Sequence, residues 1–268
     1  MKLALIAGNR NLPLAFLQCA LRDPELEIIP ICFKGETSPR IKKYASKIYW
    51  IEVGQLATLI EILEKENISQ CVMVGQISPY RIFKQQRWDT LMRTLAKRTD
   101  YRPHSIFTTF IGYLEGKGIN FLDSTLYMND LLIGEGQLNA VSISPETSAD
   151  IDFGIHQVSR YVELDVGQTI VVKNKAVLAL EALEGTDNTI KRGYRIGKRN
   201  CVVLKFSKKD QDLRFDVPVV GLSTLRLLKK IKASALVLEA SRVLILEKER
   251  FLKAAEQVQI AVVGTKRI

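Results

Sequence analysis

Cysteine and histidine are scarce in this chain, which has four cysteines and two histidines among 268 residues. The cysteines include no Cys-x-x-Cys pair and lie far apart, at Cys19, Cys32, Cys71 and Cys201. This spacing predicts neither a zinc site nor a disulfide framework, and it fits a reducing cytoplasm. We expect His104 to begin a helix and His156 to lie within one. Neither has a visible acid–base partner, so we expect structural roles for both.

Long apolar runs are also absent. No run approaches the roughly 18 uninterrupted apolar residues of a membrane helix. The first eight residues are too few for the apolar region of a signal peptide, and we expect a first strand there. The sequence contains no Gly-Lys-Ser/Thr after a glycine loop and no Gly-x-Ser-x-Gly elbow, which excludes these two nucleotide and hydrolase motifs. Arg10 and Pro13 stand where a dinucleotide-binding fingerprint requires glycine, which argues against bound NAD or FAD.

What is present is typical of an ordinary globular protein, with 47% hydrophobic and 25% charged residues. Because domains usually run to about 100–200 residues, we expect two of them. Gly, Asn, Ser, Pro and Glu dominate the stretch before Ser148, where periodicity fades. We predict an amino-terminal domain over 1–133, a linker over 134–148 and a carboxy-terminal catalytic domain over 149–268.

Short apolar runs alternate with amphipathic stretches in the first domain, which predicts a Rossmann-like fold with a mostly parallel sheet. The expected strands are Leu3–Ala7, Ile28–Phe33, Ile48–Val53, Cys71–Val74 and Ile119–Leu122. The expected helices are Leu14–Leu21, Leu56–Leu63, Trp88–Lys97 and Ile106–Leu114.

The second domain is predicted to be a separate, mixed α/β domain. It begins with a helix over about Ala149–Leu164 and a hairpin around Lys173-Asn174-Lys175, where Asn tolerates positive φ. The remaining expected elements are a helix over Asn188–Ile196, strands at Cys201–Phe206, Leu236–Leu238, Val243–Leu246 and Ile260–Val263, a helix opened by Gly221 and a helix near Glu249–Gln257.

Two turns are candidate phosphate sites. Gly8-Asn9-Arg10-Asn11 leads from the first strand into a helix, and Gly185-Thr186-Asp187 precedes another, with Thr186 or Asp187 as the expected N-cap. Backbone amides at a helix N-terminus favour anions, although a structural turn explains either segment as well. The turn Gly75-Gln76-Ile77-Ser78-Pro79 follows another strand of the same sheet, and ligands gather at that edge.

The stretch Lys205–Thr224 combines apolar and charged residues in alternation. Leu213, Phe215 and Val217 alternate with acidic and basic residues, which predicts a short strand with one anchored and one charged face. A solvated surface explains the charged face on composition alone. A nearby set of carboxylates suggests Mg²⁺-assisted phosphate chemistry, because Mg²⁺ prefers carboxylate and phosphate oxygens. The set is Glu181, Glu184, Asp187, Asp210, Asp212 and Asp216.

The net charge is +10, and two stretches, 81–102 and 191–199, are rich in Lys and Arg. Such stretches attract phosphates, so a nucleic acid, an anionic membrane surface and a phosphorylated metabolite all remain open on charge alone.

Four motifs resemble one bacterial enzyme family. They are Leu5-Ile6-Ala7-Gly8-x-x-x-Leu12-Pro13, Leu164-Asp165-Val166-Gly167-Gln168, Glu181-Ala182-x-Glu184-Gly185-Thr186-Asp187 and Gln211-Asp212-x-Arg214-Phe215-Asp216-x-Pro218-x-x-Gly221. In this order and spacing they are similar to the UDP-2,3-diacylglucosamine pyrophosphatases of lipid A biosynthesis, in the two-domain form unrelated to calcineurin-like phosphoesterases. The family's first turn is usually Gly-Gly-Gly before Leu-Pro, whereas this chain has the bulkier Asn9, Arg10 and Asn11.

The resemblance implies Mg²⁺-dependent hydrolysis of UDP-2,3-diacylglucosamine to UMP and 2,3-diacylglucosamine 1-phosphate (lipid X), in a cleft between the domains. It implies that Asp216 is catalytic, by binding Mg²⁺ or orienting the attacking water, that Asp212 assists, and that Asp210 is a solvated bystander. The substrate-binding residues that it implies are Gly8, Asn9, Leu12, Gly75, Gln76, Gly185, Thr186, Asp187, Lys205, Gln211 and Arg214.

The resemblance also suggests a homodimer in the cytoplasm, with peripheral contact to the inner membrane left open. We expect no nucleic-acid partner, since no nucleic-acid-binding motif accompanies the basic stretches. The alternative to an enzyme is a non-catalytic module that senses a nucleotide or phospholipid with the same residues.

Overall fold

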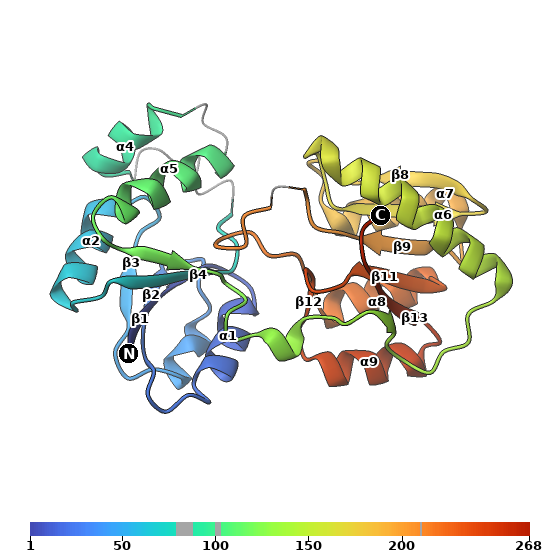
Figure 1. Cartoon of the computed structure of the whole chain (residues 1–268), viewed down its shortest axis with the longest axis horizontal. Helices are drawn as coiled ribbons and strands as arrows, with labels where there is room; N and C mark the ends of the chain where they lie inside the picture. The colour runs from blue at the N-terminus through green and yellow to red at the C-terminus, as the bar shows by residue number, and fades with distance from the viewer. Residues whose placement is uncertain (79–87, 100–102, 210) are drawn as a thin grey trace. The chain divides into compact units, whose positions relative to one another are not determined.

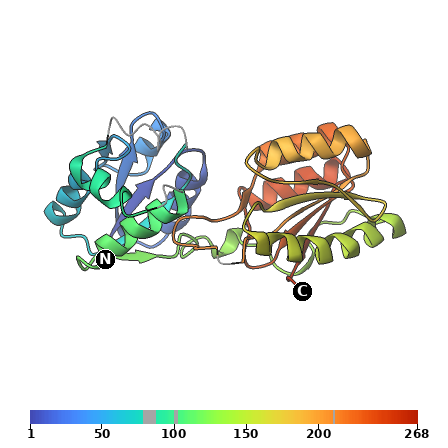
Figure 2. The same ribbon diagram turned by 90° about the horizontal axis from the view of Figure 1, so that it is seen from above.

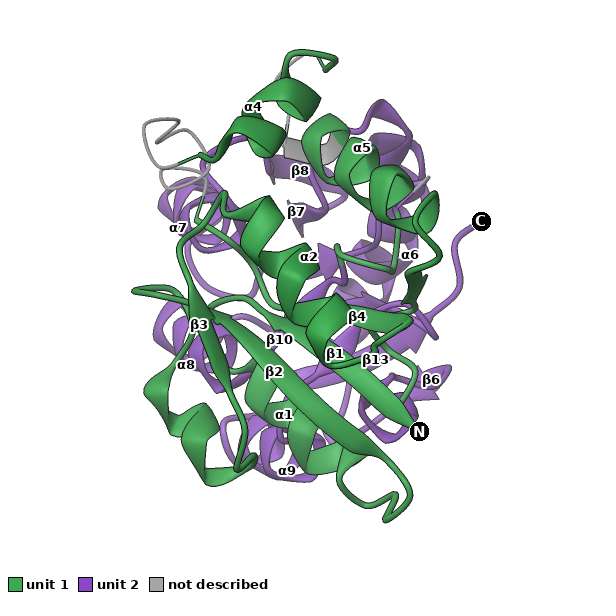
Figure 3. Cartoon of the chain, turned by 90° about the vertical axis from the view of Figure 1, so that its left-hand side faces the viewer, with its two compact units in different colours: residues 1–128, 212–216 green, residues 129–211, 217–268 purple. Residues whose placement is uncertain are grey.

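The computed structural model describes residues 1–78, 88–99, 103–209 and 211–268. Two compact units divide the chain (Figure 3). Unit 1 comprises Met1–Met128 together with Asp212–Asp216, and unit 2 comprises Asn129–Gln211 and Val217–Ile268. A short segment from the carboxy-terminal half of the sequence therefore belongs to the amino-terminal unit.

Unit 1 is built on a five-stranded parallel sheet with the order β3-β2-β1-β4-β5 (Figure 1). Each strand coincides with one of the five predicted apolar runs, which confirms the Rossmann-like prediction. The strands are β1 (Lys2–Ala7), β2 (Glu27–Phe33), β3 (Tyr49–Ile51), β4 (Gln70–Val74) and β5 (Asn120–Leu122). The helices are α1 (Leu12–Ala20), α2 (Leu56–Lys65), α4 (Thr90–Ala96), α5 (Pro103–Glu115) and the 3₁₀ helix η1 (Pro39–Lys43).

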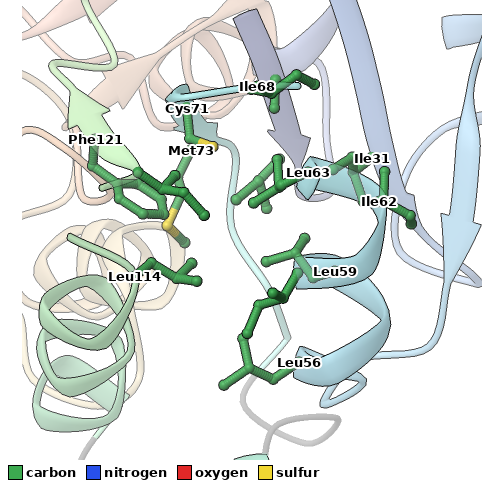
Figure 4. Close-up of a cluster of buried hydrophobic side chains, with 14 of the residues drawn as sticks. Ile31, Leu56, Leu59, Ile62, Leu63, Ile68, Cys71, Met73, Leu114 and Phe121 are labelled. Atoms are coloured by element: carbon green, nitrogen blue, oxygen red, sulfur yellow. The ribbon is translucent and has the colours of Figure 1, made fainter. Parts of the chain in front are cut away.

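Helix α2 forms because its apolar residues recur every three or four positions and give it one buried face. Leu56, Leu59 and Leu63 project from that face toward Met73 of β4 and Leu114 of α5 (Figure 4). Alternate residues of β1 and β2, such as Ile6 and Ile31, join the same core cluster.

Unit 2 contains a six-stranded mixed sheet with the order β6-β13-β11-β9-β7-β8. β9, β11 and β13 are parallel, whereas β6, β7 and β8 each run antiparallel to a neighbour. The strands are β6 (Gly136–Gln137), β7 (Thr169–Lys173), β8 (Ala176–Leu180), β9 (Val202–Lys205), β11 (Ala235–Glu239) and β13 (Ala261–Thr265), and a small parallel pair is formed by β10 (Val219–Val220) and β12 (Leu244–Ile245). The helices are α6 (Pro145–Tyr161), α7 (Thr186–Gly197), α8 (Leu222–Ile231), α9 (Lys248–Gln257) and the 3₁₀ helices η3 (Asn129–Leu131) and η4 (Val162–Leu164).

Helices cover both faces of this sheet (Figure 2). Along β7, Ile170 and Val172 pack in the cluster that contains α6, whereas Val171 packs in the cluster of α7, α8 and α9. The strand buries residues on both faces, which explains its continuous run of apolar residues. The predicted hairpin is confirmed, with positive φ at Asn174 and Lys175.

Some residues of the predicted linker 134–148 lie in regular structure. Gly136 and Gln137 form β6, which pairs with β13, and α6 begins at Pro145. These residues belong to unit 2, which starts at Asn129.

Among the described residues, no helix is both long enough and apolar enough to cross a membrane.

The predicted strand over Leu213–Val217 is wrong, because residues 213–215 form a turn. The Asp212 carbonyl accepts hydrogen bonds from the backbone N–H groups of Phe215 (3.2 Å) and Asp216 (3.0 Å), and its carboxylate accepts one from that of Arg214 (3.0 Å). Local bonding by an Asp side chain competes with strand formation. The alternation of apolar and charged residues therefore marks an anchored turn.

Candidate functional site

The turns after β1 and β4 meet at the carboxyl edge of the unit 1 sheet. Gly8 N donates to Val74 O at 2.8 Å, and Asn9 N donates to Gln76 O at 2.7 Å. The two strands are parallel neighbours, so their carboxyl ends must lie side by side. The structure thus brings together four of the substrate-binding residues that the family resemblance implies, namely Gly8, Asn9, Gly75 and Gln76.

Glycine is required in this contact. A Cβ atom on Gly8 would lie 2.6 Å from Gln76 O, and Gly75 has a φ of +94°. A Cβ contact under 3.0 Å forces the backbone to shift, so a side chain at Gly8 would disturb this contact. A φ of +94° is a conformation that residues with a side chain rarely adopt, so Gly75 also favours glycine. Leu12 begins α1 and is buried. It therefore exposes little of its side chain to a ligand.

Glu36 joins the ends of three adjacent strands. It follows β2, and its carboxylate accepts hydrogen bonds from Asn9 Nδ2 at 2.6 Å and from Ser78 N at 3.2 Å. The Asn9 amide is thereby oriented, and its Oδ1 is buried without a hydrogen-bond partner in the described chain. Sequence reasoning missed Glu36, although an acidic residue shortly after the second strand of a Rossmann-like domain is a known signal.

The Asp212–Asp216 turn docks on unit 1 through Ser124 and Phe215. Ser124 N donates to Leu213 O at 3.0 Å, and its hydroxyl contacts the carbonyl oxygens of Met73 and, at 2.9 Å, Arg214. The Phe215 ring stacks on Phe107 of α5, with centroids 5.6 Å apart and an interplanar angle of 27°. These contacts place the turn near the carboxyl ends of β4 and β5.

Arg214 is held by two carboxylates. Its guanidinium donates to both Asp212 oxygens, at 2.7–3.1 Å, and to Glu115 Oε1 at 2.7 Å. The Asp212 hydrogen bonds, aided by Glu115, raise the pKa of Arg214 above its ordinary value. Both Asp212 oxygens are engaged, so Asp212 fixes the turn and holds Arg214.

Asp216 stands at the end of the turn and is exposed, whereas Asp210 lies outside the described residues.

In unit 2, a chain of polar contacts connects Lys205 with the start of α7. Lys205 Nζ donates to Thr186 Oγ1 at 3.0 Å, and Thr186 Oγ1 donates to Glu181 Oε1 at 3.0 Å. Thr169 Oγ1 lies 3.3 Å from the same hydroxyl. Lys205 is 9% exposed, so its charge sits in a largely buried setting where it would attract an anion strongly.

The predicted N-cap at Thr186 or Asp187 is wrong, because the cap position is Gly185, with a φ of +78°. The Thr186 hydroxyl is occupied by the contacts with Lys205 and Glu181, and Asp187 is exposed. A Cβ on Gly185 would meet no atom within 4 Å, so open space lies beside the first backbone N–H groups of α7.

Gln211 and Glu181 bring partly unsatisfied polar groups into this cluster. Gln211 Oε1 accepts from Gln168 Nε2 at 3.1 Å and from Lys208 N at 2.8 Å. Gln211 Nε2 and Glu181 Oε2 are buried, and neither has a hydrogen-bond partner in the described chain. Buried polar atoms without partners are rare and costly, so a ligand that supplied the missing contacts would be favoured at this position.

Among the described residues, the carboxylates named from the sequence do not gather into a shared cation site. No group of three or more His, Cys, Asp or Glu side chains is placed in the described chain to hold a metal ion. Glu184 instead pairs with Arg192, which lowers the pKa of Glu184. Asp216 is an exposed carboxylate, and Mg²⁺ commonly binds through one or two carboxylates plus substrate phosphates. Asp216 would supply one carboxylate ligand of that kind, and the remaining ligands would come from substrate phosphates and water.

Two family models match nearly the whole chain. The LpxI N-terminal domain matches residues 2–131, and the LpxI C-terminal domain matches residues 134–263. The UDP-2,3-diacylglucosamine pyrophosphatase LpxI of Caulobacter vibrioides is 25% identical over 275 residues, which cover 98% of this chain and 97% of that protein. The chain belongs to the LpxI family.

Proposed function

We propose that this protein hydrolyses the pyrophosphate bond of UDP-2,3-diacylglucosamine and releases UMP and 2,3-diacylglucosamine 1-phosphate, in lipid A biosynthesis. The observation that carries the proposal is that both LpxI domain models match this chain, in order. The similar protein of Caulobacter vibrioides is named for this activity. The buried Lys205 beside the α7 N-terminus supports it, because both groups favour a phosphate.

In the proposed reaction, water attacks the sugar-side phosphorus, the bond from that phosphorus to the bridging oxygen breaks, and UMP leaves with the bridging oxygen. Asp216 either holds Mg²⁺ or orients the attacking water. Bound Mg²⁺ would supply positive charge at the pyrophosphate oxygens. Asp212 acts as a positioning residue, since its carboxylate binds Arg214 and the turn backbone.

Lys205 and Thr186 would bind the pyrophosphate from unit 2, and the partnerless Gln211 Nε2 would donate to it or to the nucleoside. Gly8, Asn9, Gly75 and Gln76 of unit 1 are the further residues that we propose to bind the substrate. The guanidinium of Arg214 is already paired with two carboxylates. We therefore infer that Arg214 orders the Asp212–Asp216 turn, and that its positive charge reaches the substrate only when the substrate displaces one of these two carboxylates.

Release of UMP from UDP-2,3-diacylglucosamine in the presence of Mg²⁺ tests the activity directly. We expect Asp216→Asn to lower kcat by about 100-fold or more, because this change removes a charged carboxylate without changing its size. Asp152→Asn, at an exposed position on α6, is the matched control and should keep full turnover. Equal rates in wild-type protein and Asp216→Asn, with both folded, would contradict the assignment of Asp216.

A chelator should abolish turnover, and Mg²⁺ should restore it. Tight binding of the substrate with no product under any divalent cation would favour the alternative, a sensor of nucleotides or phospholipids.

We further propose a cytoplasmic protein in peripheral contact with the inner membrane, since its proposed substrate is a lipid. The four cysteines are free, which is consistent with a reducing compartment. The homodimer stays a prediction from the family resemblance.

A further inference from the structure

An apolar cavity of about 70 Å³ lies within unit 1, at the carboxyl edge of its sheet. Its volume is several times the roughly 10–15 Å³ that one water requires on the same measure. Its walls are almost entirely apolar and include Leu56 and Leu59 of α2, Met73 of β4 and Phe107 of α5. Figure 4 shows Leu56, Leu59 and Met73 directed into the same interior region. A cavity with such walls favours an apolar ligand over water.

The cavity adjoins the Asp212–Asp216 turn. Phe107 lines the cavity and also stacks on Phe215, the residue that precedes Asp216. Ile77, in the turn after β4, lines the cavity as well, and it directly follows Gln76. A ligand in the cavity would therefore lie beside residues that we assign to the hydrolytic site.

Trp88 adds a polar feature to the apolar wall. It lines the cavity and is 4% exposed, and its indole Nε1 is buried without an acceptor in the described chain. A Cβ on Gly54 would lie 2.3 Å from Trp88 Cδ1, so glycine at this position lets the indole reach its place. The unsatisfied N–H suits a ligand that is mainly apolar but carries a hydrogen-bond acceptor, such as a carbonyl oxygen.

We propose that this cavity receives part of one acyl chain of the lipid substrate. The inference rests on the proposed function, which supplies a substrate with two acyl groups and no other long apolar part. The acyl carbonyls or other acyl oxygens are the acceptors available to Trp88 Nε1. Each methylene that enters the cavity should strengthen binding roughly fourfold. The cavity would thus contribute to recognition of acyl-chain length.

Fluorescence tests the site without relying on catalysis, because the chain has only two tryptophans, Trp50 and Trp88. In Trp50→Phe, Trp88 is the sole indole, and a long-chain fatty acid carrying a nitroxide should quench its emission by more than half, saturably. Trp88→Phe is the matched control, since Trp50 does not line the cavity. Equal quenching in the two variants, or none in Trp50→Phe, would overturn the proposal.

Kinetics provide a second test. Leu59→Phe should fill part of the cavity and raise KM at least tenfold for a long-chain substrate, while leaving hydrolysis of an analogue with two-carbon acyl groups unchanged. Leu63→Phe enlarges a buried leucine of α2 that does not line the cavity, and should show no such dependence on chain length. If Leu59→Phe does not fold, Met92→Phe, at a half-buried position lining the cavity, replaces it. An equal KM change for both substrates would refute the assignment.

The two proposals fail in different ways. Quenching of Trp88 without UMP release would keep the acyl site and remove the hydrolase function. UMP release with no quenching and no dependence on chain length would keep the hydrolase function and remove the acyl site.

Discussion

Gly8 lies close to the backbone of Gly75 and Gln76 and leaves no room for a side chain. Gly8→Ala should destabilise unit 1 by about 1–3 kcal/mol, because the new methyl group meets the Gly75-Gln76 backbone, which cannot rotate away. Gly112→Ala is the matched control in the same unit. Gly112 lies within α5, and a Cβ there meets no atom within 4 Å, so this change should stabilise the protein by about 0.5–1 kcal/mol. Urea unfolding of both variants measures the difference, and a Gly8→Ala protein as stable as wild type would disprove the close contact.

Glu66 provides a pH-dependent contribution to stability. Its carboxylate accepts hydrogen bonds from Lys47 Nζ at 2.6 Å and from Tyr49 OH at 2.5 Å, and the pKa of Glu66 is lowered chiefly by Lys47 and then by Tyr49. A depressed pKa in the folded state means that the stabilisation is present above the ordinary pKa of glutamate. It is lost as the pH falls through the lower, folded value.

We therefore expect the urea midpoint of wild type to fall from about pH 5 to pH 3 more steeply than that of Glu66→Gln. Glu64→Gln, an exposed neighbour on α2, should keep the wild-type slope. Parallel curves for wild type and Glu66→Gln would show that the Lys47 and Tyr49 contacts do not stabilise the folded state.

Among the elements, the Asp212–Asp216 turn shows which features can be predicted from the sequence and which cannot. The period-two pattern of Leu213, Phe215 and Val217 predicts a strand, whereas residues 213–215 form a turn. The pattern cannot show that Phe215 is apolar because it stacks on Phe107, more than 100 residues away. Nor can it show that the Asp212 side chain bonds the backbone locally and closes a turn. Both causes depend on tertiary contacts, which periodicity does not contain.

Phe215 should control the position of the turn. Phe215→Ala removes the stacking on Phe107 and should lower kcat by roughly tenfold or more, since small displacements of catalytic groups are costly. Phe153→Ala truncates a half-buried phenylalanine of α6 in unit 2. Both variants should lose about 1–3 kcal/mol of stability, but only Phe215→Ala should lose turnover. The assay is UMP release at a temperature where both are folded, and equal turnover in the two variants would argue against a positioning role.

At the scale of the whole molecule, the alternation of strands and helices predicts two α/β units, and periodicity finds most of their strands and helices. The pairing order of the strands and the assignment of Asp212–Asp216 to unit 1 do not follow from the sequence, because they are set by contacts between distant residues such as Ser124 and Leu213. The same limit explains why Glu36, Glu115 and Ser124 were missed. Each acts through hydrogen bonds to residues far along the chain and belongs to none of the four motifs.

The net charge of +10 and a surface on unit 2 together predict weak, salt-dependent binding to anionic membranes. Leu183 is fully exposed and Ile196 is 61% exposed, and the adjoining α7 stretch presents the exposed cations Lys191, Arg195, Lys198 and Arg199. Each cation near an anionic surface contributes about 1 kcal/mol, whereas salt at about 0.1 M screens charges beyond roughly 10 Å.

The protein should therefore sediment with phosphatidylglycerol vesicles at low salt, but not with phosphatidylcholine vesicles, and it should be released as salt rises. Leu183→Ser should weaken this binding. A leucine that inserts between lipid headgroups removes its apolar surface from water, which favours binding, and serine lacks that surface. Leu164→Ser removes another exposed leucine, outside the basic stretch, and should leave binding unchanged. If both serine variants sediment like wild type, the α7 surface is not the point of contact, and the net charge alone accounts for the attraction.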